Sequence, residues 1–388
     1  MITFAKRCKC VYGMFGVIKT YWQYIVLTAL AVAVFCYWLL LFPYIPVVRE
    51  VSQLFLWTGD YFTEHIVTPG GMARYLGEMI AQCFINPVNG AIAYTVIFVI
   101  AQLLSCRLFR QLFPTMKTAY RFVLSLVVPV ALWLLGMVPS IPLTLTVAVI
   151  MVLGAGCAIM ALPAARRLWV LLPTIAVVYW LAGTDFYDYD EEVGKEMGTY
   201  EEMECDLLLR QGEWHEIIRR FPQPESPAVR SAVILAYHKT GQMGKQELMQ
   251  NLVVPSEQHG SSLSVFNISD THFVVNFGSL SSAFIASDLA YQLYWTNIAQ
   301  RTAFEAMEFI PNYNKSGRAL KRLVETNIIS GHYDVARKYI AILEKTTFYS
   351  GWAQKMRQLV DHPEQIVNYP FLHSAQKEYE NTTDIFFI

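Results

Sequence analysis

Two carboxylates near the start of this chain are the residues best placed to do chemistry. Asp60 and Glu64 lie in the semi-apolar stretch 51–87 and are four positions apart, so on a helix they would share one face. Carboxylates can accept protons or ligate cations. One interpretation makes the pair the wetted face of an amphipathic helix on a membrane surface. The other makes it the lining of a site at that surface.

No other combination of residues indicates a reaction. The sequence contains no phosphate-binding loop ending in Gly-Lys, no Gly-x-Ser-x-Gly and no His-Glu-x-x-His. Of the 7 Cys residues, only Cys205 lies beyond residue 183, so that part of the chain has no disulfide framework. The acidic run at 184–192 lacks the glycine turn and the final Glu spacing of a calcium-binding loop. We therefore expect no cofactor and no metal site.

The composition changes abruptly near Gly183. Residues 1–183 carry 12 Lys and Arg against 4 Asp and Glu, whereas residues 184–388 carry 18 against 27. The net charges of +8 and −9 nearly cancel, so the overall charge of −1 conceals two unlike halves. Long apolar runs fill the first half, which indicates membrane spans, and the second half has the composition of a water-exposed domain.

The apolar runs predict a membrane domain. A spanning helix needs about 20 mostly apolar residues, and five segments qualify: 21–41, 91–109, 122–138, 141–162 and 168–183. The first continues past its small-x-small sites without a polar stretch, which predicts an uncleaved signal anchor. The stretch 51–87 is not expected to be a sixth span, because carboxylates at mid-bilayer are costly. Amphipathic helices on or dipping into the outer face fit it better.

Basic residues set the predicted orientation. With the N-terminus in the cytoplasm, ten Lys and Arg residues of the first half lie inside and two, Arg49 and Arg74, lie outside. Five crossings then place the acidic half outside the cytoplasm. The spans hold no ionisable residue away from their ends, which argues against a proton-driven transporter.

The second half shows a repeated helix–turn–helix pattern. An apolar helix, a Gly turn and a second helix recur around Gly212, Gly241 and Gly331, and a related unit surrounds Tyr294. Aligning Ala299 with Ala336 gives an offset of 37 residues. This resembles tetratricopeptide repeats, in which helix pairs stack into a solenoid with a concave binding face. The segment 253–282 interrupts the pattern and is expected to be an ordered loop or a helix in the groove.

With these turns and the stretch Gly70–Leu76 in view, the whole chain resembles an uncharacterised Bacteroidetes membrane family. Its members combine several spans, an extracytoplasmic first loop and a repeat-like helical tail. The resemblance implies this all-α layout: a transmembrane domain over 1–183 with an outer loop at 47–87, and an extracytoplasmic helical-repeat domain over 184–388. It supplies no activity and no catalytic residues.

The leading hypothesis is a bacterial inner-membrane protein with a cytoplasmic N-terminus and a periplasmic repeat domain. Besides the lipid bilayer, its expected partner is a protein or peptide bound during envelope assembly or polysaccharide handling. An open alternative is that the solenoid packs on the membrane half of its own chain. The acidic second half argues against nucleic-acid binding.

The rival hypothesis is an enzyme similar to multi-span lipid-linked glycosyltransferases. Those enzymes place an acidic residue in the first outer loop, and the similarity would make Asp60 the base or metal ligand, with Glu64 second. Five spans are fewer than such enzymes normally have, so the sequence leaves catalysis open and favours a binding module.

Overall fold

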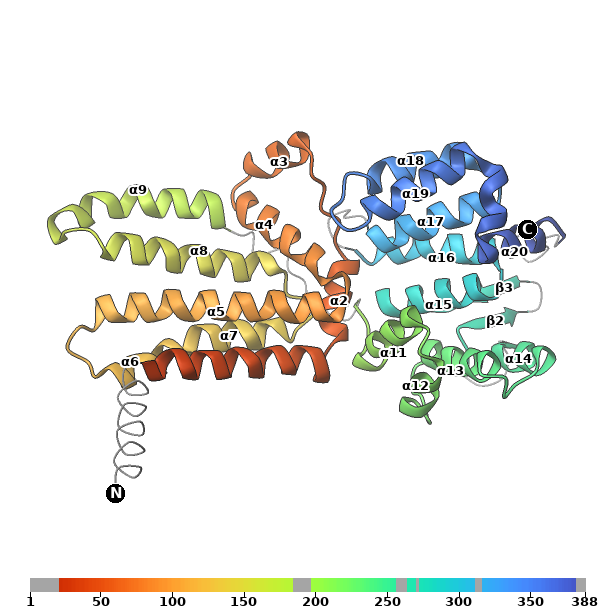
Figure 1. Ribbon diagram of the computed structural model, residues 1–388, viewed down its shortest axis with the longest axis horizontal. Helices are drawn as coiled ribbons and strands as arrows, with labels where there is room; N and C mark the ends of the chain where they lie inside the picture. The colour runs from red at the N-terminus through yellow and green to blue at the C-terminus, as the bar shows by residue number, and fades with distance from the viewer. Residues whose placement is uncertain (1–20, 184–196, 256–263, 270–271, 311–315, 382–388) are drawn as a thin grey trace, which may run out of the picture.

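The protein is elongated, with a bundle of parallel and antiparallel helices at one end and a second helical part at the other (Figure 1). The computed structural model describes residues 21–183, 197–255, 264–269, 272–310 and 316–381. The basic residues before position 21 and the acidic run at 184–192 lie outside these ranges. Below, "the bundle" means residues 21–41 and 87–182, "the connecting segment" 44–85, and "the tail" 197–381.

The bundle contains the predicted apolar helices. Four are long and apolar enough to cross a membrane: Tyr21–Leu41, α5 (Pro87–Leu112), α6 with α7 (Thr118–Ser125 and Val127–Gly136) and α8 (Leu143–Met160). The first of them ends in a π-helical turn, Tyr37–Leu41. The fifth predicted span corresponds to α9 (Ala164–Ala182), whose apolar part, Trp169–Ala182, is shorter. Arg167 in its first turn donates to the carbonyl oxygens of Met160 and Leu162 at the end of α8.

The connecting segment folds into short helices at the bundle end that faces the tail (Figure 1). They are α2 (Tyr44–Val51), α3 (Gly59–Ile66), α4 (Gly71–Ala81) and the 3₁₀ turn η2 (Gln82–Ile85). Helix α4 packs closely on α8, since a Cβ on Gly77 would lie 2.8 Å from the backbone nitrogen of Thr144. Helix α3 is peripheral and contains no buried residue.

The tail is built from helices arranged as antiparallel pairs. Its helices are α11 (Tyr200–Gln211), α12 (Trp214–Arg220), α13 (Pro227–Lys239), α14 (Lys245–Leu252), α15 (Leu280–Gln292), α16 (Thr296–Glu308), α17 (Gly317–Ile329), α18 (Tyr333–Leu343), α19 (Ser350–Asp361), η5 (Pro363–Asn368) and α20 (Pro370–Asn381).

The chain is helical as predicted, apart from a small sheet in the tail. Strands β1 (Val253–Pro255), β2 (Phe266–Ser269) and β3 (His272–Val275) form it in the order β1-β2-β3, with β1 parallel and β3 antiparallel to β2. The prediction of a loop or helix over 253–282 was therefore wrong for these residues. Valine and phenylalanine favour strands, but each run is too short to show a clear period beside its Ser- and Asn-rich neighbours.

Four turns of the tail share one backbone geometry. Gly212, Gly241, Tyr294 and Gly331 all have positive φ, from 63° to 77°. In each turn the next residue donates its N–H to the carbonyl five positions earlier: Glu213 to Leu208, Gln242 to Tyr237, Trp295 to Ala290 and His332 to Asn327. This is the hydrogen bond of the Schellman motif, which satisfies a free carbonyl at a helix end. The turns that the sequence suggested are thus built alike.

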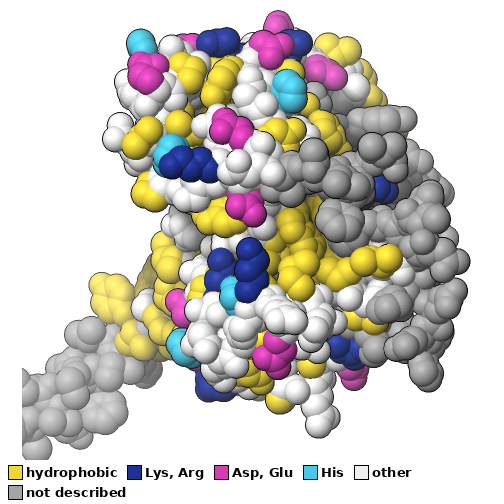
Figure 2. Space-filling view, turned by 90° about the vertical axis from the view of Figure 1, so that its right-hand side faces the viewer, with side chains coloured by type: hydrophobic (Ala, Val, Ile, Leu, Met, Phe, Trp, Pro, Cys, Tyr) yellow, Lys and Arg dark blue, Asp and Glu magenta, His cyan; other side chains and the backbone are white. Residues whose placement is uncertain are grey.

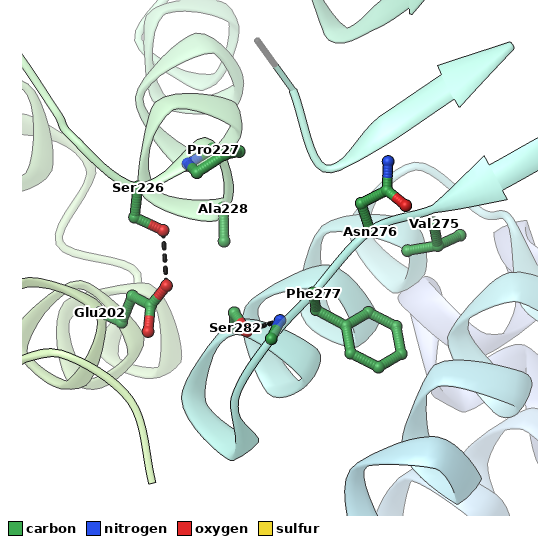
Figure 3. Close-up of a pocket in the computed structure, with 9 residues that line it drawn as sticks. Glu202, Ser226, Pro227, Ala228, Val275, Asn276, Phe277 and Ser282 are labelled. Atoms are coloured by element: carbon green, nitrogen blue, oxygen red, sulfur yellow. Dashed lines mark hydrogen bonds between the residues drawn. The ribbon is translucent and has the colours of Figure 1, made fainter. Parts of the chain in front are cut away.

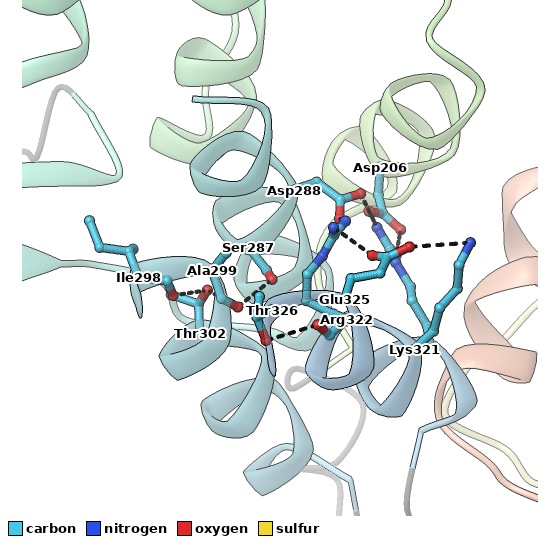
Figure 4. A network of polar contacts seen from close by, with 11 residues as sticks. Asp206, Ser287, Asp288, Ile298, Ala299, Thr302, Lys321, Arg322, Glu325 and Thr326 are labelled. Carbon is cyan, nitrogen blue, oxygen red and sulfur yellow. Dashed lines mark hydrogen bonds and ion pairs between the residues drawn. The ribbon is translucent and has the colours of Figure 1, made fainter. Parts of the chain in front are cut away.

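A buried ionic network ties three tail helices together (Figure 4). Arg318 on α17 donates two hydrogen bonds of 2.6 Å to Asp206 on α11 and one of 2.8 Å to Asp288 on α15. Arg322 donates to the other oxygen of Asp288, also at 2.6 Å. Burial alone would raise the pKa of Asp288, but the two guanidinium groups lower it to about 2.

The bundle and the tail meet over one continuous apolar core. Val34, Ala91 and Phe98 of the bundle belong to the same buried cluster as Leu207 and Phe284 of the tail. Helix α2 lies at the junction, and all eight of its residues are buried. Part of the tail's surface therefore does pack on the first half of its own chain.

Two neighbouring residues of α2 hold the two sides of this junction. Arg49, which is 3% exposed, donates to the carbonyl oxygens around the α7–α8 turn, at Leu135, Gly136, Val138 and Ile141. Glu50, also 3% exposed, accepts a 2.8 Å hydrogen bond from the Tyr349 hydroxyl, just before α19. The chain thus fixes the bundle with one side chain and the tail with the next.

Candidate functional site

The two sequence-predicted site residues lie on the surface of α3. Thr58 caps this helix by accepting a hydrogen bond from the backbone N–H of Tyr61. Asp60 and Glu64 are both exposed and form no ion pair within the described residues. The structure therefore does not bring them together with a second chemistry-bearing side chain.

The neighbouring face of α3 carries a partly buried polar cluster. The Tyr61 hydroxyl donates to Oε2 of Glu78 on α4, and Nε2 of His65 lies 3.0 Å from the same oxygen. The side chains of His65 and Glu78 are 11% and 7% exposed. Rings of Phe55, Tyr61 and Tyr75 surround the group, with Tyr61 and His65 centroids 4.3 Å apart. The cluster holds α3 against α4.

The hydrogen bonds of His65 define where its protons are. Nδ1 lies 2.8 Å from the carbonyl oxygen of Tyr61, and a carbonyl can only accept, so Nδ1 carries hydrogen. Nε2 faces a carboxylate oxygen, so one further proton must lie between Nε2 and Glu78. The pair is either an imidazolium with a carboxylate or a neutral imidazole with a carboxylic acid.

The surroundings favour the protonated imidazole. Burial alone would lower the pKa of His65, but the hydrogen bond and charge of Glu78 outweigh it and raise that pKa. Burial and the neighbouring Glu78 also raise the pKa of Tyr61, so the phenol stays a donor. The cluster therefore holds an imidazolium that donates to the carboxylate of Glu78.

Sequence reasoning missed this cluster because it considered only the two carboxylates that lie one helical turn apart, Asp60 and Glu64. Tyr61 and His65 are four positions apart, as Asp60 and Glu64 are, so the same periodicity placed them on a neighbouring face. Glu78 lies in the apolar helix GMARYLGEMIA, and a carboxylate on an otherwise apolar helix needs a buried partner. The spacing of Tyr61 and His65, together with a carboxylate on a mostly apolar helix, was the signal in the sequence for this cluster.

The tail contains a pocket of about 270 Å³ between α11, α13 and the segment that leads from β3 to α15 (Figure 3). Pro227, Ala228, Val275 and Phe277 give it apolar walls, and its polar lining is Glu202, Ser226, Asn276 and Ser282. Asn276 is exposed. The pocket has the size of a side chain or a small head group and offers both kinds of contact.

Glu202 stands where three helices begin. Its carboxylate accepts from Ser226 Oγ at 2.6 Å, from Ser279 Oγ at 2.8 Å and from the backbone N–H of Thr199 at 3.1 Å. Thr199, Ser226 and Ser279 are the N-cap residues of α11, α13 and α15. A carboxylate offers about four acceptor positions, so Glu202 can receive about one more donor from the pocket.

The end face of the tail is mixed in character. Hydrophobic side chains gather at mid-height of this face, and Lys, Arg, Asp and Glu side chains are scattered above and below them (Figure 2). Exposed apolar residues of the tail include Ile268, Val274, Phe304 and Val367. Within the described residues no group of three His, Cys, Asp or Glu side chains could hold a metal ion.

Comparison with known proteins places the chain in a family. Searches of curated proteins and of solved structures found no significant match. A family model does match, over residues 19–187 and 189–388, which is nearly the whole chain. The protein therefore belongs to the family of unknown function DUF6057.

Proposed function

We propose that this protein is a bacterial inner-membrane protein whose bundle anchors a periplasmic helical-repeat tail, and that the tail binds a protein partner in envelope or polysaccharide processes. The observation that carries the proposal is the junction at α2. Arg49 and Glu50 and the continuous apolar core hold the tail in one orientation on the bundle. A module fixed in this way presents its surface at a defined distance from the membrane.

The positions of the basic residues support the proposed orientation. Arg107, Arg110, Lys117, Arg166 and Arg167 lie in or beside the α5–α6 and α8–α9 connections, at the bundle end away from the tail (Figure 1). Cytoplasmic loops are enriched in such residues. The tail, at the other end, is then periplasmic, with five helices of the bundle crossing.

The shared turn geometry supports the repeat assignment. Tyr294 and Gly331 have equivalent φ and hydrogen bonds and are 37 residues apart, close to the period of tetratricopeptide-like units. Helix pairs of this kind expose side chains for peptide recognition. The pocket beside Glu202 supplies a contact point, with apolar walls for a side chain and a carboxylate for a donor.

A photocrosslinking experiment on the whole chain in its native membrane tests this function. A benzophenone amino acid at Asn276, in the pocket, should give one defined protein adduct, and the same probe at the exposed Val367 should not. The captured protein, once purified, should bind wild-type protein and the Val367→Lys variant equally. It should bind Asn276→Lys about tenfold more weakly, a loss of about 1.4 kcal/mol. Equal binding to all three would refute the pocket as the contact.

The enzymatic alternative has one observation in its favour, the hydrogen-bonded pair of His65 and Glu78, whose histidine lies on the same helix as Asp60 and Glu64. An enzyme similar to lipid-linked glycosyltransferases should bind a polyprenyl phosphate in detergent, measured by native mass spectrometry. With Mg²⁺ present, Asp60→Asn with Glu64→Gln, or Glu78→Gln, should weaken that binding, because Asp60 as a metal ligand would hold the phosphate through the cation. Unchanged binding in both variants, or none in the wild type, would exclude this alternative.

A further inference from the structure

Helix α3 presents three chemically distinct faces. At 100° per residue, Tyr61 and His65 point in one direction, toward Glu78, as their contacts show. Phe62 and Ile66 follow on one flank, and Asp60 and Glu64 on the other. One face of the helix therefore packs on α4 through the Tyr61–His65–Glu78 cluster. On one side of that face the helix is apolar, and on the other side it is acidic.

The position of α3 matches the end of the apolar helices. The backbone N–H of Gly70, just after α3, donates a 2.8 Å hydrogen bond to the carbonyl oxygen of Trp180, near the end of α9. Tyr179 and Trp180 are 67% and 47% exposed, and aromatic residues of this kind concentrate at membrane–water interfaces. Phe62 and Val67 are exposed as well, at 36% and 69%. The apolar surface of the bundle thus continues onto α3.

We propose that α3 is an interfacial helix that lies in the head-group region of the outer leaflet. Its Phe62–Ile66 flank enters the acyl-chain boundary and its Asp60–Glu64 flank faces water. The inference rests on the membrane part of the proposed function. It assigns Asp60 and Glu64 to hydration of this helix, and it makes the Tyr61–His65–Glu78 cluster the clamp that sets the angle at which α3 meets the lipid.

The charge of α3 specifies the kind of lipid contact. The helix contains Asp60 and Glu64 but no Lys or Arg. Attraction to anionic head groups depends on basic residues, so insertion of α3 must come from its apolar area alone. The contact should therefore gain nothing from anionic lipid, and high salt should not weaken it.

Lipid photocrosslinking in proteoliposomes tests the proposal with the whole chain. A benzophenone amino acid replaces Phe62 or Glu64, and reference probes replace Val96 on the exposed face of α5 and Val367 in the tail. Mass spectrometry then measures adducts with phosphatidylcholine acyl chains. Positions 62 and 96 should form adducts several-fold more often than 64 and 367. High salt should not lower the yield at 62, and added phosphatidylglycerol should not raise it.

The reference probes distinguish a failure of the interfacial assignment of α3 from a failure of the membrane assignment of the bundle. Adducts at 96 without adducts at 62 would overturn the interfacial assignment and leave the membrane bundle intact. Equal adducts at 62 and 64 would also overturn it, because α3 would then be fully immersed. Absence of adducts at 96 would overturn the membrane assignment and this inference with it. A yield at 62 that rises with added phosphatidylglycerol and falls at high salt would refute the apolar mode of insertion.

Discussion

The hydroxyl of Tyr349 donates a 2.8 Å hydrogen bond to Oε1 of Glu50, linking two residues that lie 299 positions apart in the sequence. Its ring fills the space over Gly317, where a Cβ would lie 2.6 Å from Cε2 of the tyrosine. The other oxygen of Glu50 has no hydrogen-bond partner within the described residues. Tyr349 is thus the donor that makes a buried carboxylate tolerable at the junction.

Replacing Tyr349 by Phe should weaken the junction. The ring would keep its packing on Gly317, but Glu50 would lose this partner, and an unsatisfied buried polar group costs about 1–3 kcal/mol. Thermal unfolding of the whole chain in detergent should show the loss, together with faster proteolysis between bundle and tail. Tyr200→Phe is the matched control, because Tyr200 is 52% exposed; equal stabilities of the two variants would contradict this role.

The buried state of Glu50 predicts a pH effect of its own. Burial raises the pKa of this carboxyl, and nearby Arg210 and the Tyr349 hydrogen bond only partly oppose the shift. A folded pKa above the unfolded value means that the native state holds the proton more tightly, so stability falls as pH rises through the folded pKa. Glu50→Gln should remove the contribution of this carboxyl, so the stability of the variant should fall less as pH rises through the folded pKa of Glu50. An unchanged curve would show that Glu50 does not titrate in the folded protein.

Arg49 should not tolerate replacement by Lys. Its guanidinium serves four carbonyl oxygens around the α7–α8 turn, and an ammonium has neither the planar fork nor enough donors. Arg49→Lys should cost about 3 kcal/mol, at the upper end for hydrogen bonds from a charged group, measured as a lower unfolding midpoint in detergent. Arg74→Lys, at an exposed site of the same connecting segment, should leave the midpoint unchanged.

Local patterns predict the helices but not the contacts between them. The apolar runs and the turn glycines Gly212, Gly241 and Gly331 follow from residue type alone. Tyr294 takes the same backbone conformation without any such signal, since its φ of 63° is rare for a bulky residue. Its ring lies 5.2 Å from that of Phe371, a contact that no local pattern reveals.

For the site residues, too, local patterns predict the helices but not the contacts between them. Sequence analysis counted Arg49 as one of two outer charges and singled out Asp60 and Glu64 as carboxylates one helical turn apart in a semi-apolar stretch. The structure instead buries Arg49, Glu50 and Glu78, leaves His65 half-buried, and exposes the two predicted carboxylates. Each buried group has a partner on another helix, up to 299 residues away. Such pairings depend on the tertiary fold, so a single sequence does not display them.

Two glycine substitutions should move stability in opposite directions. Gly331 has φ of 76°, and nothing lies within 4 Å of the position that a Cβ would take there, so Gly331→Ala introduces backbone strain alone, about 1–2 kcal/mol. Gly351 also has open space but lies in α19 with ordinary helical φ, so Gly351→Ala should stabilise by about 0.5–1 kcal/mol. Thermal unfolding of both variants measures the difference, and equal shifts would contradict the positive-φ turn.

The His65–Glu78 pair should make the docking of α3 depend on pH. The pKa of His65 is raised in the folded state, so its stabilising effect is fully present below the ordinary value of about 6.5. The effect is then lost as pH rises through the folded pKa, because neutral Nε2 would face the carboxylate with a lone pair. Unfolding midpoints of the wild type should fall over that range, and His65→Gln should lack the step. His362→Gln, at a side chain that is 61% exposed, should retain the wild-type curve, and a step that survives in His65→Gln would assign the pH dependence to another group.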